Sequence, residues 1–329
     1  MQSLPDGFDI ERLPGLLQTG WGITPAQVTY APLGFGSYHW IVEAETGLRF
    51  FVTVDDLDDK PWLGSTRDTA YDGLVLAFDT SLTLHSDQML EFVVAPIPGL
   101  SGVGVLRVAD RYALSVYPYV DGVAGEFGGE LDPDRRTAVV DLLARLHRAS
   151  PLQVRPRVDV PFADRASLEK AVSEPGAGWS PGPYSGPAHL WLREHAAGLR
   201  RRVDEFDRLQ GSLSGRPLTI THGEPHPGNM LSAAGGLLLI DWDTVALAPP
   251  ERDLWLVHDP EGAALGEYEE RTGYRADHQL LSMYRLAWDL SDVAAYLAVL
   301  RSARVRTADT EEAWQNITGM TSIDGPPRR

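Results

Sequence analysis

The sequence predicts an α+β protein in which short β-strands dominate the first third of the chain and helices dominate the rest. Three early stretches, residues 28–33, 40–44 and 48–54, are rich in β-branched and aromatic residues and are bounded by turn-forming residues, which is typical of strands. Later segments, such as residues 133–149 and 283–300, place apolar residues at helical spacing. The length of 329 residues allows one large domain or two lobes, with a packed core in either case.

Composition restricts the class of function. The chain has 46 acidic and 29 basic residues and a net charge of −17, which disfavours a nucleic-acid partner because phosphate backbones are bound by Lys and Arg patches. The absence of cysteine excludes disulfides, a thiolate nucleophile and a zinc–thiolate site. The sequence shows no 18-residue apolar run and no charged-then-apolar leader. We therefore expect a cytoplasmic enzyme with no membrane partner and a neutral or cationic substrate.

The strongest chemical signal lies in residues 221–243. A loop carries Glu224 and Asn229 five residues apart, and an apolar run then ends in Asp241 and Asp243. Oxygen ligands of this kind hold Mg²⁺ on nucleotide phosphates, and a carboxylate can orient an attacking hydroxyl for phosphoryl transfer. The pattern assigns Glu224 as the base and Asn229 and Asp241 as metal ligands, while Asp243 either adds a ligand or fixes the hairpin. Taken singly, each fragment also fits a turn or a strand end.

The same spacing occurs in the catalytic loop of protein kinases, where an Asp precedes an Asn by five residues and a metal-binding Asp follows on the next hairpin. With its H-G-x-x-H-P-G-N and I-D-W-D motifs, the segment resembles the aminoglycoside phosphotransferase family of kinase-like small-molecule kinases. The resemblance covers residues 28–300, and its specificity is concentrated in residues 221–255. It implies a bilobal protein-kinase-like fold. A nucleotide-binding lobe with a small antiparallel β-sheet and a helix is expected over residues 1–118, and a mainly helical catalytic and substrate-binding lobe over residues 119–329.

The first elements of this fold are a leading helix over residues 8–21 and a glycine turn between the first two strands. The turn contains Gly34, Gly36 and Ser37. Because glycine has no Cβ, such a turn can lay backbone N–H groups over nucleotide phosphates, although an ordinary hairpin turn has the same sequence pattern. The resemblance implies that these three residues contact the nucleotide.

The third strand departs from the family pattern. In the family this strand carries a lysine that grips the α- and β-phosphates, but the matching position is Thr53. The sequence has only two lysines, and of these only Lys60 lies close to the strand, whereas Lys170 is remote. Either Lys60 or Arg67 reaches the phosphates, or the glycine turn and Mg²⁺ hold them without a cation. Thr53 and Lys60 are therefore both assigned to the nucleotide site.

A helix behind the sheet and two more strands complete the small lobe. The expected ranges are 68–84 for the helix and 92–96 and 106–112 for the strands. Residues 113–120 resemble the hinge that offers backbone hydrogen bonds to the nucleotide base. The nucleotide contacts that the resemblance implies there are Tyr117, Tyr119 and Val120.

In the larger lobe, residues 133–149 resemble the first long helix of the family. His147 within it is interpreted as a structural hydrogen-bonding residue rather than a catalytic one. The segment A-P-P-E-R-D-L-W resembles a family segment whose aspartate, here Asp253, anchors the catalytic loop from behind. His222 and His226 are interpreted as braces of that loop.

The late apolar helix at residues 283–300 contains two carboxylates, Asp289 and Asp292, on one face. Carboxylates on a mainly buried helix are costly unless they are paired or face a wet cavity. In similar enzymes the C-terminal helices line the acceptor pocket, so both residues are candidate substrate contacts. A buried ion pair with Arg285 or Arg301 explains them equally well.

The leading hypothesis is a Mg²⁺-dependent kinase, monomeric or homodimeric, that uses ATP or GTP to phosphorylate a hydroxyl of an aminoglycoside or another hydroxylated antibiotic. A metabolic kinase acting on a sugar, amino alcohol or nucleoside is the second reading. The third is a pseudokinase, which Thr53 and the glutamate at position 224 both suggest.

Overall fold

The computed structural model describes the chain except residues 35, 127–128, 130, 150–155, 260 and 321–329. Its contacts divide the chain into two compact units. The first unit comprises Met1–Asp159 and Pro217–Arg275, and the second comprises Val160–Arg216 and Ala276–Arg329. The lobe boundary predicted between residues 118 and 119 falls inside the first unit, at the end of a strand, and it stays a prediction.

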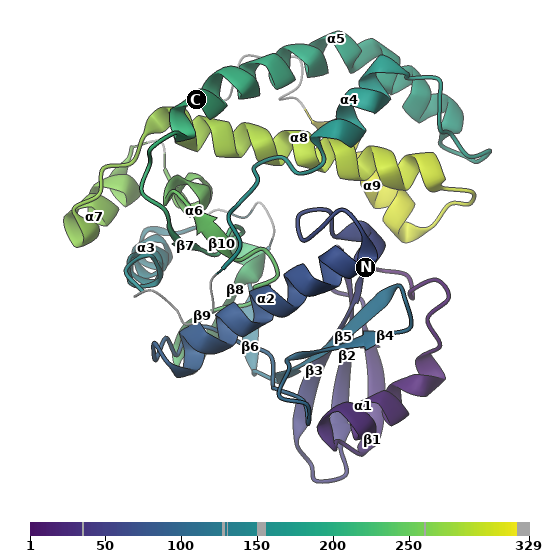
Figure 1. Ribbon diagram of the computed structural model, residues 1–329, viewed down its shortest axis with the longest axis vertical. Helices are drawn as coiled ribbons and strands as arrows, with labels where there is room; N and C mark the ends of the chain where they lie inside the picture. Colours follow the sequence, from purple (N-terminus) through teal and green to yellow (C-terminus); the bar gives the residue numbers. More distant parts are fainter. Residues whose placement is uncertain (35, 127–128, 130, 150–155, 260, 321–329) are drawn as a thin grey trace. The chain divides into compact units, whose positions relative to one another are not determined.

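A five-stranded antiparallel sheet forms the N-terminal part of the first unit, with the strand order β1-β2-β3-β5-β4 (Figure 1). The strands are β1 (Pro25–Ala31), β2 (Ser37–Ala44), β3 (Arg49–Asp56), β4 (Val105–Val108) and β5 (Tyr112–Pro118). The first three correspond to the strands predicted from residue types. β5 includes most of the predicted hinge, so only its last residues follow the strand.

The strand predicted at residues 92–96 is wrong. Val93 instead forms an isolated parallel bridge with Leu239. The backbone N–H of Val94 donates to Leu239 O at 3.0 Å, and the N–H of Leu239 donates to Phe92 O at 2.7 Å. The segment is extended because its hydrogen-bond partner is a strand far along the chain, which the local sequence does not reveal.

The two faces of the sheet differ in chemistry because strand side chains alternate between faces. One face forms an apolar core with α1 (Leu13–Trp21), which follows the 3₁₀ turn η1 (Ile10–Arg12) and buries Leu13 and Leu17 completely. The strand residues in this core include Trp40, Val42, Val52, Val54, Leu114 and Val116. The opposite face carries a set of polar residues, which we call the polar ladder: Ser37, His39, Thr53, Asp55, Ser115 and Tyr117.

Helix α2 (Arg67–Ser86) follows β3 after the 3₁₀ turn η2 (Leu57–Asp59), close to the predicted range. Thr66 begins the helix, since its side chain accepts from the backbone of Thr69 and the Thr69 side chain returns the bond in a capping box. Phe78 of α2 contacts the ring of Tyr117 edge-on, with centroids 6.0 Å apart. Helix α2 therefore packs on the face of the sheet that bears the polar ladder.

The remainder of the first unit consists of short strands and three helices. The helices are α3 (Pro133–His147), α6 (Glu251–Val257) and α7 (Ala263–Thr272). Strands β6 (Gly122–Ala124), β8 (Met230–Ala233) and β9 (Gly236–Leu239) form one small sheet, and β7 (Thr219–Thr221) pairs with β10 (Ala246–Ala248). Helix α3 begins where Asp132 accepts a bond from the N–H of Arg135 and Pro133 occupies the first turn.

The second unit is helical among its described residues (Figure 1). It contains α4 (Arg165–Ser173), α5 (Ser185–Gln210), the 3₁₀ turn η3 (Gly211–Leu213), α8 (His278–Ser302) and α9 (Ala308–Gly319). The long helices α5 and α8 pack along one another. Across the described residues of both units, every helix is too short or too polar to cross a membrane.

Candidate active site

The loop predicted to be catalytic lies between two short antiparallel pairs in the first unit. Strand β7 ends at Thr221, opposite Ala246 of β10. The loop then passes through the 3₁₀ turn η4 (Pro227–Asn229) into the β8–β9 hairpin. The N–H of Ile240, just after this hairpin, donates to Asn229 O at 3.1 Å. This bond brings the segment that carries Asp241 beside Asn229.

Asp253 anchors the loop from behind, as the sequence predicted. Its carboxylate is buried in α6 and accepts from the backbone N–H groups of His222 at 2.9 Å and Gly223 at 2.6 Å. It also lies 3.0 Å from Nε2 of His147, whose Nδ1 lies 2.7 Å from the hydroxyl of Tyr268. The pKa of Asp253 is lowered although burial opposes the shift, because the hydrogen bond and charge of His147 favour the carboxylate. The structural role predicted for His147 is confirmed.

Gly223 allows a close approach of the loop to Arg252, a residue that the sequence analysis missed. Gly223 has φ of 101°, and a Cβ there would lie 2.3 Å from a guanidinium nitrogen of Arg252. Arg252 donates to Thr221 Oγ1 at 3.1 Å and to Thr244 O at 3.0 Å, and its Nε lies 2.9 Å from Asp159. This buried arginine therefore joins the start of the loop to the segment after Asp243.

His222 braces the loop in its neutral form. Its Nε2 donates to Ile240 O at 2.9 Å, and its Nδ1 accepts from the N–H of Glu224 at 3.2 Å, an arrangement that requires one proton on the ring. Burial lowers the pKa of His222, which agrees with a neutral imidazole. Thr244 Oγ1 donates to His222 O at 2.7 Å. The bracing role predicted for His222 is confirmed.

Glu224 and Asn229 are connected across the loop. Nδ2 of Asn229 donates to the backbone oxygen of Glu224 at 3.1 Å, and the N–H of His226 donates to the same oxygen at 2.8 Å. Asn229 is buried, whereas the Glu224 side chain is partly exposed. The amide of Asn229 thus uses its donor within the loop and retains its Oδ1 as an acceptor for a cation.

Asp241 lies where several carboxylates converge. Its φ of 65° is unusual for a residue with a Cβ, and it retains solvent exposure. Desolvation and the charge of Asp243 raise the pKa of Asp241 well above its usual value, with smaller contributions from Glu224 and Asp55, while Lys60 opposes the shift. Charged groups from the catalytic loop and from residues 55–60 therefore act on Asp241 together with its neighbour Asp243.

Asp243 is buried and holds the ammonium of Lys60, with Oδ2 and Nζ 2.7 Å apart. Lys60 Nζ also lies 2.9 Å from Asp55 Oδ1 and 2.9 Å from Ser37 Oγ. Burial by itself would lower the pKa of Lys60, but Asp243 and Asp55 raise it well above its usual value, so the ammonium stays charged. Arg67, the other candidate cation, is instead bound to Asp58 and Asp110 at the surface.

The donor set suits a cation that is shared with a substrate. Within the described part of the chain, no group of three or more His, Asp or Glu side chains could hold a metal by itself. Mg²⁺ is typically held by one or two carboxylates together with substrate phosphates and water. Asp241, the Oδ1 of Asn229 and the excess of negative charge around Asp241 fit that arrangement.

Comparison with known proteins identifies the family. The model of the APH group, described as the phosphotransferase enzyme family, matches residues 90–284, more than half of the chain. The chain belongs to this phosphotransferase family. It is therefore a small-molecule phosphotransferase that acts on hydroxyl groups. Protein StrN from Streptomyces griseus is 30% identical over 291 residues, which cover 83% of this chain and 85% of StrN.

Solved structures agree with a kinase-like α+β fold for this phosphotransferase. A spectinomycin phosphotransferase in complex with ADP and spectinomycin has a TM-score of 0.72 at 19% identity, covering 96% of this chain and 95% of its own. Amicoumacin kinase hAmiN in complex with AMP-PNP, Ca²⁺ and Ami has a TM-score of 0.59 at 14% identity, covering 96% of this chain and 93% of its own. Choline kinase LicA from Streptococcus pneumoniae has a TM-score of 0.58 at 14% identity, covering 94% and 96%.

The glycine turn of the phosphotransferase has the backbone that its sequence suggests. Gly34 has φ of 63° and Gly36 has φ of 94°, and both are in the left-handed region that glycine adopts at little cost. Ser37 begins β2 and donates its hydroxyl to Asp55 at 2.7 Å. The turn therefore leads into the polar ladder at Ser37, beside Lys60. Nucleotide contact by these residues stays a prediction.

The other residues assigned to the nucleotide occupy β3 and the end of β5. Thr53 is buried, and its hydroxyl lies 3.2 Å from Nδ1 of His39, so it does not replace a cation. Desolvation and the charge of Asp55 raise the pKa of Tyr117 well above its usual value. Tyr119 stacks under Arg49, with the guanidinium 4.1 Å from the ring centre, and Val120 follows it, half-buried. Their contacts with a nucleotide base stay a prediction.

The candidate substrate carboxylates Asp289 and Asp292 lie on α8 in the second unit, whereas the site residues described above belong to the first unit. Desolvation and the charge of Asp289 raise the pKa of Asp292 to about 7, against a hydrogen bond from Trp288. Arg301, offered as an alternative partner, lies 5.1 Å above the ring of Trp179. Asp289 and Asp292 therefore lie close enough for the charge of Asp289 to act on Asp292.

Sequence analysis missed Asp55 and Arg157 as well as Arg252. Asp55 contacts Lys60, and the alternation of β3 places it on the same face as Thr53, which was the available signal. Arg157 donates to Trp62 O at 3.1 Å and to Thr244 O at 2.8 Å. It thereby ties the segment after β3 to the segment after Asp243. Desolvation and the nearby charge of Arg252 lower the pKa of Arg157 to about 10.

Proposed function

We propose that this phosphotransferase moves the γ-phosphoryl group of ATP or GTP to a hydroxyl of a small molecule. The proposed acceptor is an aminoglycoside or another hydroxylated antibiotic. The observation that carries the proposal is the convergence of Glu224, Asn229 and Asp241 in one loop and hairpin, joined by the hydrogen bonds of Asn229. Phosphoryl transfer needs positioned carboxylates and a metal site rather than a protein nucleophile.

In the proposed step, the carboxylate of Glu224 accepts the proton of the acceptor hydroxyl while its oxygen attacks the γ-phosphorus. The bond between that phosphorus and the bridging β-phosphate oxygen breaks, and the nucleoside diphosphate leaves. The bonds of the loop to Asp253 and His222 fix the backbone of Glu224. The charge of its carboxylate acts on Asp241. Glutamate is one methylene longer than the usual aspartate, which implies an acceptor set slightly farther back.

Asn229 and Asp241 are proposed as protein ligands of Mg²⁺, with Asp243 in a secondary role. Bound Mg²⁺ would neutralise charge on the β- and γ-phosphates. The crowding of carboxylates around Asp241 supports a cation at this place. Gly34, Gly36 and Ser37 are proposed to approach the phosphates, and Tyr117, Tyr119 and Val120 to line the base. The polar ladder supports a nucleotide whose phosphates lie at the glycine turn and whose base lies at the end of β5.

The antibiotic class of the acceptor is supported by similarity and by charge. The similar solved structures include a kinase of spectinomycin and a kinase of amicoumacin. The net charge of −17 and the pair Asp289 and Asp292 favour an acceptor that carries an amine. We propose that these two carboxylates contact the acceptor.

A metabolic kinase is the second candidate, because choline kinase LicA has nearly the same structural similarity as the amicoumacin kinase. Choline also carries a positive charge, so acidic side chains do not separate the two candidates. The nature of the acceptor has to be measured directly.

The test is a screen at fixed Mg²⁺ with ATP and GTP against aminoglycosides, spectinomycin, amicoumacin, choline, ethanolamine, sugars and nucleosides. Release of diphosphate is followed together with mass detection of a phosphorylated acceptor. A phosphorylated antibiotic with the highest kcat/KM in the panel supports the proposal. Preferred phosphorylation of choline or another metabolite would replace it with the second candidate.

A further inference from the structure

The polar ladder is a buried polar face that the catalytic loop does not account for. Ser37 lies opposite Asp55, and His39 lies opposite Thr53, in the pairing of β2 with β3. Ser37, Thr53 and Asp55 are each 8% exposed or less. Buried polar groups are retained at a cost unless they are hydrogen-bonded or serve a ligand. The bonds between Ser37 and Asp55 and between His39 and Thr53 satisfy part of this face, which leaves a polar surface available for a ligand.

Lys60 lies at one end of the polar ladder and joins three parts of the first unit. Its ammonium is 3% exposed and donates to Ser37 at the end of the glycine turn, to Asp55 on β3 and to Asp243 after the hairpin. All three contacts are 2.7–2.9 Å long. In kinases a strand lysine bridges the nucleotide phosphates and a carboxylate in the same way. Lys60 has that set of neighbours although it follows the strand.

Asp55 supplies the matching carboxylate. Its Oδ1 accepts from both Lys60 and Ser37. Its Oδ2 is buried and accepts no hydrogen bond from the part of the chain that the structure describes. A buried carboxylate oxygen without a hydrogen bond costs free energy. Because Asp55 belongs to a central strand, it fixes the ammonium relative to the sheet.

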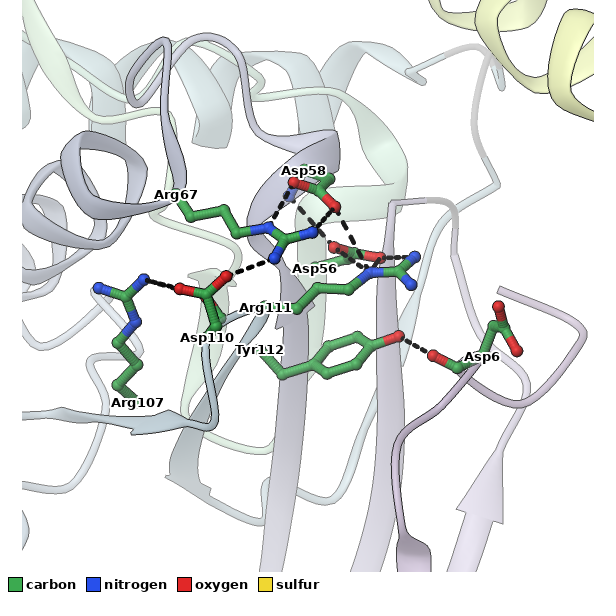
Figure 2. Close-up of polar contacts among 8 residues, drawn as sticks. All are labelled: Asp6, Asp56, Asp58, Arg67, Arg107, Asp110, Arg111 and Tyr112. Carbon is green, nitrogen blue, oxygen red and sulfur yellow. Dashed lines mark hydrogen bonds and ion pairs between the residues drawn. The ribbon is translucent and has the colours of Figure 1, made fainter.

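A network of ion pairs holds the short segment that carries Lys60 (Figure 2). Asp56, at the end of β3, is bound by Arg111 with Nη2 and Oδ2 2.6 Å apart, and the N–H of Leu57 donates to Arg111 O at 2.9 Å. Arg67 binds both oxygens of Asp58 at 2.6–2.7 Å and also contacts Asp110. The turn η2 is therefore clamped before Lys60.

The segment is also held after Lys60. Nη1 of Arg157 donates to Trp62 O, and Nη2 of the same guanidinium donates to Thr244 O. Since Thr244 follows Asp243 directly, this arginine sets the distance between the Lys60 segment and the hairpin. The two clamps preorganise the ammonium, which is the property that makes an electrostatic contact effective in phosphoryl transfer.

We propose that Lys60 is the phosphate-binding lysine of this phosphotransferase and that Asp55 is its positioning carboxylate. The lysine lost from β3 at Thr53 is thereby replaced from the turn that follows the strand. This inference rests on the proposed function. It assigns Lys60 to contact with the α- and β-phosphates of the donor nucleotide. This assignment does not depend on the identity of the acceptor.

The experiment uses the fact that the sequence has only two lysines. An acyl-phosphate derivative of ATP transfers its acyl group to a lysine Nζ beside the bound phosphates, and peptide mass spectrometry locates the product. We expect acylation of Lys60 that excess Mg·ATP suppresses, with the exposed Lys170 on α4 showing no protection. Failure of the probe to label Lys60, in a preparation shown by a separate assay to bind Mg·ATP, would overturn the inference. This measurement uses the unaltered protein, so it does not depend on how a variant folds.

Variants give a second measurement. Lys60→Ala is expected to weaken Mg·AMP-PNP binding at least tenfold and to lower kcat/KM by about 10²- to 10³-fold. Lys170→Ala is the matched control and should stay within twofold. Asp55→Asn is expected to raise the KM for nucleotide by about tenfold and to leave the KM for the acceptor within twofold. Wild-type binding and turnover in Lys60→Ala would overturn the inference.

The two proposals fail in different ways. If the wild-type enzyme phosphorylates an acceptor and Lys60→Ala does so equally well, the inference is wrong and the proposed function stands. If Lys60 is labelled and protected but no acceptor in the panel is phosphorylated, the nucleotide contact is supported and the proposed acceptor class is wrong.

Discussion

The ammonium of Lys60 and the carboxylate of Asp243 lie 2.7 Å apart, although 183 positions separate the two residues in the chain. This buried contact joins the turn after β3 to the segment after the β8–β9 hairpin. Removal of one member of a buried pair leaves an uncompensated charge and is costly. The contact therefore joins the polar ladder of the sheet to the segment that carries Asp241.

Asp241→Asn is expected to lower kcat by at least about 100-fold, because the neutral amide is a poor ligand for Mg²⁺ beside phosphates. The measurement is steady-state turnover across a Mg²⁺ titration, with the thermal midpoint Tm as the control for folding. The variant should unfold at a Tm equal to or above that of the wild type, since the crowded carboxylates around Asp241 repel one another. Full activity would remove Asp241 from the metal site.

Glu224→Gln is expected to lower kcat by about 10²- to 10⁴-fold, the usual contribution of a general base. Glu224→Asp is the matched control, because it keeps the carboxylate and shortens its reach by one methylene. We expect Glu224→Asp to retain more activity than Glu224→Gln, with nucleotide binding unchanged in both variants. Equal and nearly normal rates would show that Glu224 does not accept the proton.

Gly223→Ala is expected to destabilise the protein by about 1–3 kcal/mol, because φ of 101° strains a residue with a Cβ and that Cβ would lie 2.3 Å from Arg252. Gly235→Ala in the β8–β9 turn is the control, since a Cβ there meets no atom within 4 Å. Calorimetry of both variants gives the comparison. Similar Tm values for the two would contradict the close approach of Arg252.

Asp253 should contribute to stability at neutral pH and lose that contribution in acid. Its folded-state pKa is lowered below the reference value of 3.8, so the stabilisation is present above that value and is lost as the pH falls through the lower folded value. Asp253→Asn is expected to cost roughly 2–3 kcal/mol at pH 7. The difference in Tm from the wild type should shrink below pH 4. A difference that stays constant down to pH 2.5 would contradict the assigned ionisation.

Asp292 should show the opposite pH dependence. Because its pKa is raised from 3.8 to about 7, the folded protein binds the proton more tightly, and stability is lost as the pH rises from 4 through 7. Asp292→Asn is therefore expected to raise the Tm at pH 8 and to change it little at pH 4. The same variant should raise the KM of an amine-bearing acceptor. An equal change in Tm at both pH values would show that Asp292 is not held neutral.

The residues of the candidate site could be predicted because they lie in one continuous segment of the sequence. Glu224, Asn229 and Asp241 lie within eighteen consecutive positions, and the covalent chain keeps such a loop and hairpin together. The same holds for the anchoring by Asp253, which follows the hairpin closely. The early strands were also predictable, since residue alternation reports burial directly.

Contacts between distant segments were not predictable in the same way. The extended segment at residues 92–96 was taken for a strand of the sheet, but its hydrogen bonds go to Leu239. Alternation places Asp55 and Thr53 on one face of β3 without saying what covers that face. Arg157 and Arg252 gave no local signal, because their partners are backbone oxygens and hydroxyls elsewhere in the fold.

The sequence by itself determined the family resemblance, the α+β class and the residues of the catalytic loop. Each of these depends on residue types and their spacing within short continuous segments. The sequence left open whether Lys60, Arg67 or neither reaches the phosphates, and the tertiary structure shows which of the two side chains lies at the polar ladder. Lys60 enters the buried polar ladder and contacts Asp243, whereas Arg67 stays at the surface with Asp58 and Asp110. That outcome depends on how β3, its following turn and the hairpin pack together, and the free energy of such packing is shared among residues that are far apart in the sequence.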